Sequence, residues 1–277
     1  MEFPLTTLII GQNSNLTRAL LCVIPDSIAL SSRHLSDTIE LLEPYKNQTI
    51  NLIFNNFQTS TQLGDSLHLI QYIENSIQIT AKILEYFNET SIAKIVYTSS
   101  SSVYGNNIFC DEHDGVMPLN LHAALKVSNE KLIEQYAKNR QIDYTIARIF
   151  NMFGGEDIFS IISKIITAYR ESSPLTIVNN GNAIRDFIHI DTVVEVYQKL
   201  LNTIEIPIIN IGSGKGTSIR NILDFLKNHG ISIQTQNLLR EELKISTANN
   251  TIMLNLLGHT TSIDVEEYLL TQLQKNR

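Results

Sequence analysis

The chain has 277 residues, of which 43% are hydrophobic and 18% are charged, and its formal net charge at pH 7 is −7. A chain of this length and composition buries a large core and suits one large domain with a smaller appendage. The negative charge argues against a nucleic-acid partner, because phosphate backbones are bound by clustered Lys and Arg. No apolar run is long enough to span a bilayer, so we expect a cytoplasmic protein with no membrane partner.

The cysteine content excludes a disulfide scaffold. Cys22 is expected in an apolar helix and Cys110 in a loop, and two such residues form neither a disulfide framework nor a metal-ligand set. We therefore predict no metal site and a structural role for both thiols.

Apolar, β-branched runs alternate with helical segments through the first half of the chain. This alternation predicts a parallel sheet that is covered by helices on both faces. The expected fold class is α/β, a Rossmann-type doubly wound parallel sheet with a smaller C-terminal lobe. The predicted strands are 5–10, 27–30, 50–54, 95–98 and 144–149, and the predicted helices are 18–24, 67–87, 121–139 and 158–170.

The turn after the first predicted strand carries a degraded dinucleotide fingerprint. Of three glycines at G-x-x-G-x-x-G spacing only Gly11 is present, and Ser14 and Thr17 occupy the other two places. Both replacements are small hydrogen-bond donors, and the helix that follows would offer its N–H groups to a phosphate. Gly11, Ser14, Asn15 and Leu16 are the candidate cofactor-binding residues here, and an ordinary strand-to-helix turn is the alternative.

The end of the second predicted strand indicates which cofactor would bind. The residue that hydrogen-bonds the ribose 2′-hydroxyl of NAD is typically Asp or Glu, whereas this chain has Ser31, Ser32 and Arg33. Hydroxyls beside an arginine suit a 2′-phosphate, so NADP is the predicted cofactor and NAD the second choice. The alternative for Arg33 is a solvated loop charge.

Four hydroxyl residues, Ser99 to Ser102, follow the strand predicted at 95–98. Ligands of an open parallel sheet gather beyond the carboxyl ends of its strands, where such serines can donate to a substrate oxygen.

We expect the dinucleotide-binding domain to cover 1–150, and whether 180–215 returns to it is left open. Residues 151–277 are expected to form mainly the substrate lobe.

Five ordered blocks carry a family resemblance over nearly the whole chain. They are Val96–Gly105 (VYTSSSSVYG), Lys126 with Glu130, Ala147–Gly154 (ARIFNMFG), Arg185–Asp191 (RDFIHID) and Ile209–Gly214 (INIGSG). The chain resembles the extended short-chain dehydrogenase/reductases, the NAD-dependent epimerase/dehydratase family that acts on nucleotide sugars.

The resemblance implies three catalytic positions. Ser100 matches the family serine that hydrogen-bonds the reacting oxygen of the substrate, and its neighbours Ser99 and Ser101 would contact the substrate. Lys126 matches the family lysine that holds the nicotinamide ribose and biases the pKa of the adjacent acid/base. The family tyrosine belongs four residues before this lysine, and that position is His122.

His122 leaves three interpretations open. Imidazole titrates near pH 6.5 and the Lys126 ammonium would lower that pKa, so a neutral ring could replace the tyrosine as acid/base. A nearby tyrosine could instead be recruited, although Tyr97 and Tyr104 both match framework positions of the family. In the third interpretation the usual chemistry is lost or much reduced.

The resemblance also assigns the nucleotide-sugar half. Asn151 would contact the substrate diphosphate, Arg185 would clamp a phosphate, and a helix N-terminus near 157–160 would frame the same groove. Arg148 is expected to brace loops and His189 to be a core histidine. Asn75 matches a family asparagine that lies behind the active site and is expected to support it, and the acidic pair at 111–112 is expected to be solvated.

These residues together predict an enzyme, most directly an NADP-linked 4-keto-sugar reductase or epimerase in polysaccharide or deoxysugar biosynthesis. The substrate would be a nucleotide-diphosphate sugar. The alternative is a catalytically impaired family member that binds a nucleotide or nucleotide sugar as a scaffold or regulatory subunit. The family also implies a homodimer that pairs through the helices predicted at 67–87 and 121–139.

Overall fold

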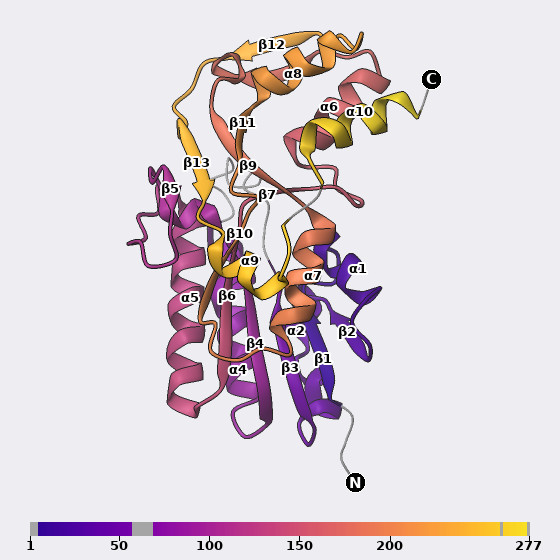
Figure 1. Cartoon of the computed structure of the whole chain (residues 1–277). Helices are drawn as coiled ribbons and strands as arrows, with labels where there is room; N and C mark the ends of the chain where they lie inside the picture. Colours follow the sequence, from indigo (N-terminus) through magenta and orange to yellow (C-terminus); the bar gives the residue numbers. More distant parts are fainter. Residues whose placement is uncertain (1–4, 57–68, 261–262, 276–277) are drawn as a thin grey trace.

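The computed structural model describes residues 5–56, 69–260 and 263–275. Its larger part is a six-stranded sheet (Figure 1). The strands are β1 (Thr6–Ile10), β2 (Ser27–Leu30), β3 (Thr49–Phe54), β4 (Ser91–Ser100), β6 (Asp143–Ile149) and β10 (Ile208–Ile211). They lie in the order β10-β6-β4-β3-β1-β2, and each neighbouring pair is parallel. The predicted α/β fold with a doubly wound parallel sheet is confirmed.

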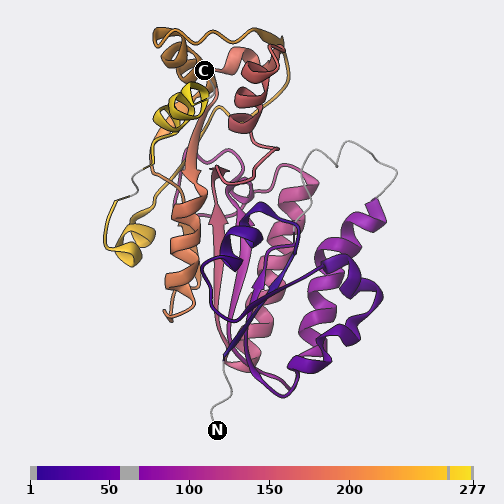
Figure 2. The same ribbon diagram turned by 90° about the vertical axis from the view of Figure 1, so that its right-hand side faces the viewer.

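Helices cover both faces of this sheet, and β1 shows why. Leu8 and Ile10 lie in one apolar cluster and Ile9 lies in the other, as the twofold repeat of a strand requires. The first cluster is covered by α2 (Ser32–Asp37), α4 (Ile79–Tyr86) and α5 (Leu121–Arg140), and the second by α1 (Asn15–Leu21), α7 (Ile190–Leu200) and α9 (Thr251–Leu257). Figure 2 shows α7 and α4 on opposite sides of the strands. Among the described residues, no helix combines the length and apolarity needed to cross a bilayer.

The smaller lobe lies at the top of Figure 1. It has its own apolar core. Its helices are α6 (Ile161–Arg170), α8 (Ile219–Asn228) and α10 (Val265–Gln274). Its strands, together with one from the 107–114 loop, are β5 (Phe109–Cys110), β7 (Asn151–Phe153), β8 (Leu175–Val178), β9 (Ile184–His189), β11 (Gly216–Ser218), β12 (Thr235–Leu238) and β13 (Ile245–Ala248). A sheet of order β11-β9-β13-β5, with β7 also paired to β9, joins this lobe to the loop that follows β4. After β9 the chain returns to the large sheet as α7 and β10.

The strand order creates a topological switch point at the carboxyl ends of β1 and β3. From β1 the chain crosses through α1 to β2 on one side, and from β3 it proceeds through α4 to β4 on the other. The two connections lie on opposite faces of the sheet. Ligands of open α/β sheets bind at such a point, outside the carboxyl ends of the strands.

Several predicted elements differ from the observed ones at their ends. Only β2 keeps the predicted bounds. Residues 67–68 of the predicted long helix lie outside the described residues, and the rest is α3 (Leu69–Ile73), a π-helical turn (Glu74–Gln78) and α4. The start predicted for the helix at 158–170 is wrong, because Ser160 caps α6.

Arg148 and Glu130 form a buried ion pair between β6 and α5. Arg148 donates from Nη2 to Glu130 Oε2 at 2.8 Å and from Nε to Oε1 at 3.2 Å, and both side chains are 5% exposed. The guanidinium also lies 4.7 Å from the centroid of the Tyr104 ring. The interpretation of Arg148 as a bracing residue is confirmed.

Removing this carboxylate charge is expected to destabilise the protein strongly. Glu130→Gln leaves Arg148 buried without its counter-ion, so the free energy of unfolding should fall by about 3–5 kcal/mol. Urea unfolding of both proteins measures the difference. The matched control is Glu134→Gln on the same helix, where the carboxylate pairs with surface lysines and the change should stay within about 1 kcal/mol. Equal losses in the two variants would contradict this account.

Candidate functional site

The turn after β1 is held together by its own side chains. Gly11 has φ +115°, and a Cβ there would lie 2.4 Å from the Asn55 carbonyl oxygen, so only glycine fits. Ser14 donates to Thr17 Oγ1 at 2.9 Å, and Thr17 donates to the Gly11 carbonyl at 2.8 Å. Asn55 Nδ2 donates to both hydroxyl oxygens, at 2.6 and 2.8 Å. The two hydroxyls that replace glycines therefore donate their hydrogen bonds within the turn. This differs from the expected donation to a phosphate.

Asn15 joins this turn to the loop that follows β7. Its Nδ2 donates to the Gly154 carbonyl at 2.9 Å, and its Oδ1 accepts from the Glu156 N–H at 2.9 Å. One turn along α1, Arg18 Nε lies 2.7 Å from the Glu156 carboxylate. The backbone N–H groups of Asn15 and Leu16 belong to the first turn of α1, where helix geometry supplies no intrahelical partner. These N–H groups are the ones suited to a phosphate.

The end of β2 meets the same turn, because the N–H groups of Gly11 and Gln12 donate to the Leu30 carbonyl at 2.8 and 3.2 Å. Ser31 caps α2 by accepting from the His34 N–H at 3.4 Å, and Arg33 is exposed. No carboxylate occurs between residues 27 and 36. The residues that would contact an adenosine ribose, Ser31 to Arg33, are therefore polar or positively charged.

The serines that end β4 have different surroundings. Ser99 is 3% exposed and donates to the Glu130 carboxylate, so it braces the buried ion pair instead of contacting a substrate as predicted. Ser100 is partly exposed and accepts from the Ser102 N–H at 3.2 Å, which caps the 3-10 turn Ser101–Tyr104. A hydroxyl that accepts this bond keeps its proton for another acceptor. Ser100 is thus the serine best suited to a substrate oxygen.

Lys126 is buried beneath the end of β4. Its Nζ donates to the Thr98 carbonyl at 2.7 Å and lies 5.0 Å from the centroid of the Tyr97 ring. Burial lowers the pKa of this ammonium to about 7, although the nearby Glu130 carboxylate acts to raise it. The lysine fastens α5 to the strand that carries Ser100.

His122 lies one helical turn before Lys126, near the start of α5. Burial first, and the Lys126 ammonium second, lower the imidazole pKa to about 4, so the ring is neutral at pH 7. The predicted direction of this shift is confirmed, although burial contributes more than the lysine. The Tyr72 hydroxyl lies 3.2 Å from His122 Nδ1. Sequence reasoning missed Tyr72, because nothing in the local pattern of α3 indicates a contact with a residue 50 positions later.

The residues expected to bind a diphosphate are also engaged in hydrogen bonds. Asn151 Nδ2 donates to the Asp186 carbonyl at 2.9 Å. Arg185 donates to the carbonyls of Ile184 and Leu243, at 2.8 and 2.6 Å, and to Glu242 at 3.3 Å. Asp157 accepts from the backbone N–H groups that precede α6, so the helix start expected to frame a phosphate carries a carboxylate.

A cavity of about 1260 Å³ lies next to Ile184, the neighbour of Arg185. Arg240 and Lys244 line it from the smaller lobe, and Asn120 lines it from the start of α5. The contribution of residues 240–245 to this cavity could not be predicted from the sequence, because these residues carry no recognisable motif. The cavity is lined by residues of segments 106–120, 179–184 and 240–245.

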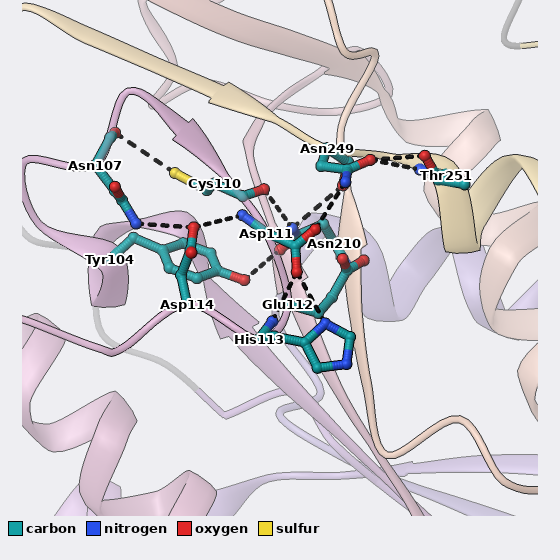
Figure 3. Close-up of polar contacts among 10 residues, drawn as sticks. All are labelled: Tyr104, Asn107, Cys110, Asp111, Glu112, His113, Asp114, Asn210, Asn249 and Thr251. Carbon is teal, nitrogen blue, oxygen red and sulfur yellow. Dashed lines mark hydrogen bonds and ion pairs between the residues drawn. The ribbon is translucent and has the colours of Figure 1, made fainter.

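A polar network anchors the 107–114 loop beside this site (Figure 3). Glu112 is 7% exposed and accepts from the Asn210 N–H at 2.8 Å, and Asp111 accepts from Asn249 at 2.7 Å. The Asn210 side chain accepts from the Tyr104 hydroxyl at 2.7 Å. The expected solvated pair at 111–112 is therefore wrong for Glu112, whose burial raises its pKa.

His189 has the expected core position. It is 7% exposed, accepts from the Asp191 N–H at the start of α7, and packs against the rings of Phe153 and Tyr268. Asp186 likewise accepts from backbone N–H groups of the Gly212–Gly214 turn and of β13. The motif around these residues joins the two lobes.

The residues at the switch point between β1 and β3 fit a nucleotide cofactor. Asn55 and Asn56 are 1% and 7% exposed, and the Oδ1 atom of each is buried without a hydrogen-bond partner in the described parts of the chain. Buried acceptors of this kind require donors, and ribose hydroxyls would supply them. With the first-turn N–H groups of α1 and the Lys126 ammonium, these atoms form a set that suits a dinucleotide.

Comparison with known proteins yields one family and many similar structures. The model of the "NAD dependent epimerase/dehydratase family" matches residues 14–212. A putative UDP-glucose 4-epimerase of Methanocaldococcus jannaschii is 33% identical over 54% of this chain and 51% of its own. A UDP-glucuronate 4-epimerase of Thermodesulfobacterium geofontis is 28% identical over 72% of this chain and 64% of its own. The chain thus aligns with about half to two thirds of these relatives.

Two crystal structures show the same fold. UDP-glucuronic acid 4-epimerase of Bacillus cereus, in complex with UDP-glucuronic acid and NAD, has a TM-score of 0.82 at 22% identity, over 99% of this chain and 100% of its own. UDP-glucose 4-epimerase of Thermus thermophilus, in complex with NAD, has a TM-score of 0.85 at 16% identity, over 98% of both chains.

The low imidazole pKa gives a prediction for acid pH. Below about pH 6.5 the unfolded chain binds a proton at His122, whereas the folded protein does so only near pH 4. The free energy of unfolding should therefore decrease as pH falls through this interval, and the decrease should be smaller in His122→Asn. NMR titration of the ring protons locates the pKa. His259 is an internal reference, because hydrogen bonds to the Thr260 carbonyl and Glu195 raise its pKa. A His122 midpoint at 6.5 or above would contradict the assignment.

Proposed function

Because the chain belongs to the NAD dependent epimerase/dehydratase family, we propose that it modifies nucleotide sugars by hydride transfer with a nicotinamide cofactor. Its leading form is an NADP-linked reductase of a 4-keto sugar, and a 4-epimerase is the close alternative. The observation that carries the proposal is the anchoring of Lys126 on the Thr98 carbonyl. This bond brings the first turn of α5, with His122, to the strand end that carries Ser100.

Each of these residues has a role that its surroundings support. The Ser100 hydroxyl, which keeps its proton, hydrogen-bonds the sugar oxygen at the reacting carbon. Lys126 holds ribose hydroxyls of the cofactor, and a pKa near 7 lets it do so with or without its charge. When bound, the cofactor would supply or accept the hydride at the sugar C4. In the direction of reduction, the oxygen on that carbon would take the proton of the Ser100 hydroxyl, and the partly exposed Ser100 would regain a proton from water. His122 contacts the same sugar oxygen from the start of α5.

The nucleoside diphosphate occupies the large cavity beside the smaller lobe. Its volume of about 1260 Å³ is large enough for a nucleotide sugar, because ordinary small-molecule sites have roughly 300–1,000 Å³. Arg240 and Lys244 in its wall, and Arg185 close behind it, supply cations for phosphate oxygens. The named activities of the two epimerase relatives support a UDP-sugar as substrate.

The proposal also covers the choice between NADP and NAD, the biosynthetic process and the oligomeric state. Arg33 and the absence of Asp and Glu from residues 27–36 favour NADP, whereas the structural relatives were solved with NAD, which remains the second choice. We assign the reaction to polysaccharide or deoxysugar biosynthesis in the cytoplasm. Exposed apolar side chains on α3, at Leu69, Ile70 and Ile73, support a homodimer through this helix and α5.

A specific observation also favours the alternative of a non-catalytic binding protein. The hydroxyls of Ser14 and Thr17 close the turn that glycines keep open in a dinucleotide fingerprint. If this turn excludes the cofactor, the cavity beside Arg240 would still bind a nucleotide sugar. Binding of UDP without binding of either reduced cofactor would decide for this alternative.

Replacing the partly exposed serine tests the catalytic proposal. Ser100→Ala removes a donor to the reacting oxygen, so kcat/KM for an NDP-4-keto sugar should fall by about a hundredfold or more. Oxidation of NADPH, followed by absorbance, measures the rate. The control is Ser128→Ala on the exposed side of α5, which should keep full activity. Full activity of Ser100→Ala would exclude the proposed role.

Replacing the arginine after β2 tests the cofactor choice. Arg33→Ala removes the cation proposed to pair with the 2′-phosphate, so NADPH binding should weaken at least tenfold while NADH binding stays unchanged. Calorimetric titration of both cofactors, after removal of any copurified nucleotide, gives the dissociation constants. Arg170→Ala, an exposed position on α6, should change neither. Equal weakening of NADPH and NADH would argue against a 2′-phosphate contact.

A further inference from the structure

Tyr72 is the hydrogen-bond partner of the histidine that occupies the family tyrosine position. It lies on α3 and is 7% exposed, and its hydroxyl is 3.2 Å from His122 Nδ1. The π-helical turn Glu74–Gln78 follows directly, and such turns occur frequently at functional sites. Asn129 of α5 donates to Ser76 of this turn at 3.0 Å, so the two helices are fastened beside the contact.

The proton of this hydrogen bond belongs to the tyrosine. A phenol has one proton to donate, and among the described residues the Tyr72 hydroxyl has no partner other than His122 Nδ1. If Nδ1 carried a proton, the phenol proton would have no acceptor among these described residues, and a buried donor without an acceptor costs about 1–3 kcal/mol. An unused phenol lone pair costs less. Donation from Tyr72 to Nδ1 is therefore favoured, and it places the proton of the neutral ring on Nε2.

The electrostatic surroundings keep both partners neutral. Burial and the Lys126 ammonium lower the pKa of His122 to about 4, and burial raises the pKa of Tyr72. The position of His122 in the first turn of the long helix α5 acts in the same direction, because the helix dipole opposes a cation there. A neutral imidazole with its proton on Nε2 donates a hydrogen bond but is a poor base.

We propose that Tyr72 is a positioning residue that holds His122 as the neutral Nε2–H tautomer, so that His122 donates a hydrogen bond to the sugar oxygen beside Ser100. The donor role rests on the proposed function, whereas the tautomer is a property of the protein alone. Neutral imidazoles held near helix N-termini polarise carbonyls in this way in other enzymes. His122 is then a hydrogen-bond donor and not the acid/base that takes the place of the tyrosine.

Nitrogen NMR of the protein without ligands tests the tautomer. Long-range proton–nitrogen correlation of ¹⁵N-histidine-labelled protein at pH 7, assigned by its loss in His122→Asn, should show a protonated Nε2 and a hydrogen-bonded, unprotonated Nδ1. Tyr72→Phe should shift the Nδ1 signal to that of an unbonded nitrogen or add the second tautomer. Tyr86→Phe, which removes a hydroxyl bonded to Glu43, should leave the His122 signals unchanged. A proton on Nδ1, or His122 signals unaltered by Tyr72→Phe, would overturn the proposal.

Steady-state kinetics test the consequence for the reaction. Tyr72→Phe should lower kcat for the 4-keto sugar by roughly tenfold to a hundredfold at unchanged KM, because a misoriented donor acts mainly in the transition state. Tyr86→Phe should keep the wild-type kcat. Unchanged kcat in Tyr72→Phe would overturn the positioning role. An inactive wild-type protein that shows the predicted tautomer would refute the proposed function, and with it the donor role, but not the assignment of the hydrogen bond.

Discussion

The structure of the site depends on one buried ammonium. Lys126 is 6% exposed, and a charge at such a depth is tolerated only with close compensation. The Thr98 carbonyl accepts from it, the Tyr97 ring lies beside it, and Glu130 follows one helical turn later. These contacts fix α5 against the end of β4. They also place His122 where burial and a nearby cation keep the imidazole neutral.

Glu130 connects this ammonium to the rest of the fold. The same carboxylate accepts from Ser99 and pairs with Arg148, whose guanidinium lies over the Tyr104 ring. Tyr104 in turn donates to Asn210 on β10, so the network crosses from α5 to the edge of the sheet. The two serines at the end of β4 thus differ in their contacts: Ser99 braces the ion pair, and Ser100 keeps a hydroxyl proton for another acceptor.

The residues around the turn after β1 have features that argue both for and against a bound cofactor. Ser14, Thr17 and Asn55 fill the turn with hydrogen bonds, and Asn15 attaches it to the loop after β7. Unpaired amide oxygens of Asn55 and Asn56, in contrast, require donors that the described protein does not supply. A cofactor that binds here would contact backbone N–H groups and amide oxygens in place of an open glycine turn.

Much of the fold followed from local patterns, whereas the site did not. The short apolar runs at 27–30 and 50–54 predicted strands, although β2 is a partly exposed edge strand and β3 contains the buried polar residue Asn51. The motif spacing also placed His122 one turn before Lys126. No pattern could show that the Ser99 hydroxyl is directed to Glu130, that Tyr72 meets His122 or that Glu112 is buried. These contacts join residues 31 to 98 positions apart and are formed only when the layers pack.

We propose that this site transfers hydride to the carbon of a nucleotide-linked ketone. Incubation of the protein with an NDP-4-keto sugar and NADPH deuterated at nicotinamide C4, in both stereochemical forms, tests it by mass spectrometry of the product. We expect a reduced nucleotide sugar that carries one deuterium from one of the two forms of the cofactor. An unlabelled and unreduced sugar, in a protein that binds both ligands, would contradict it.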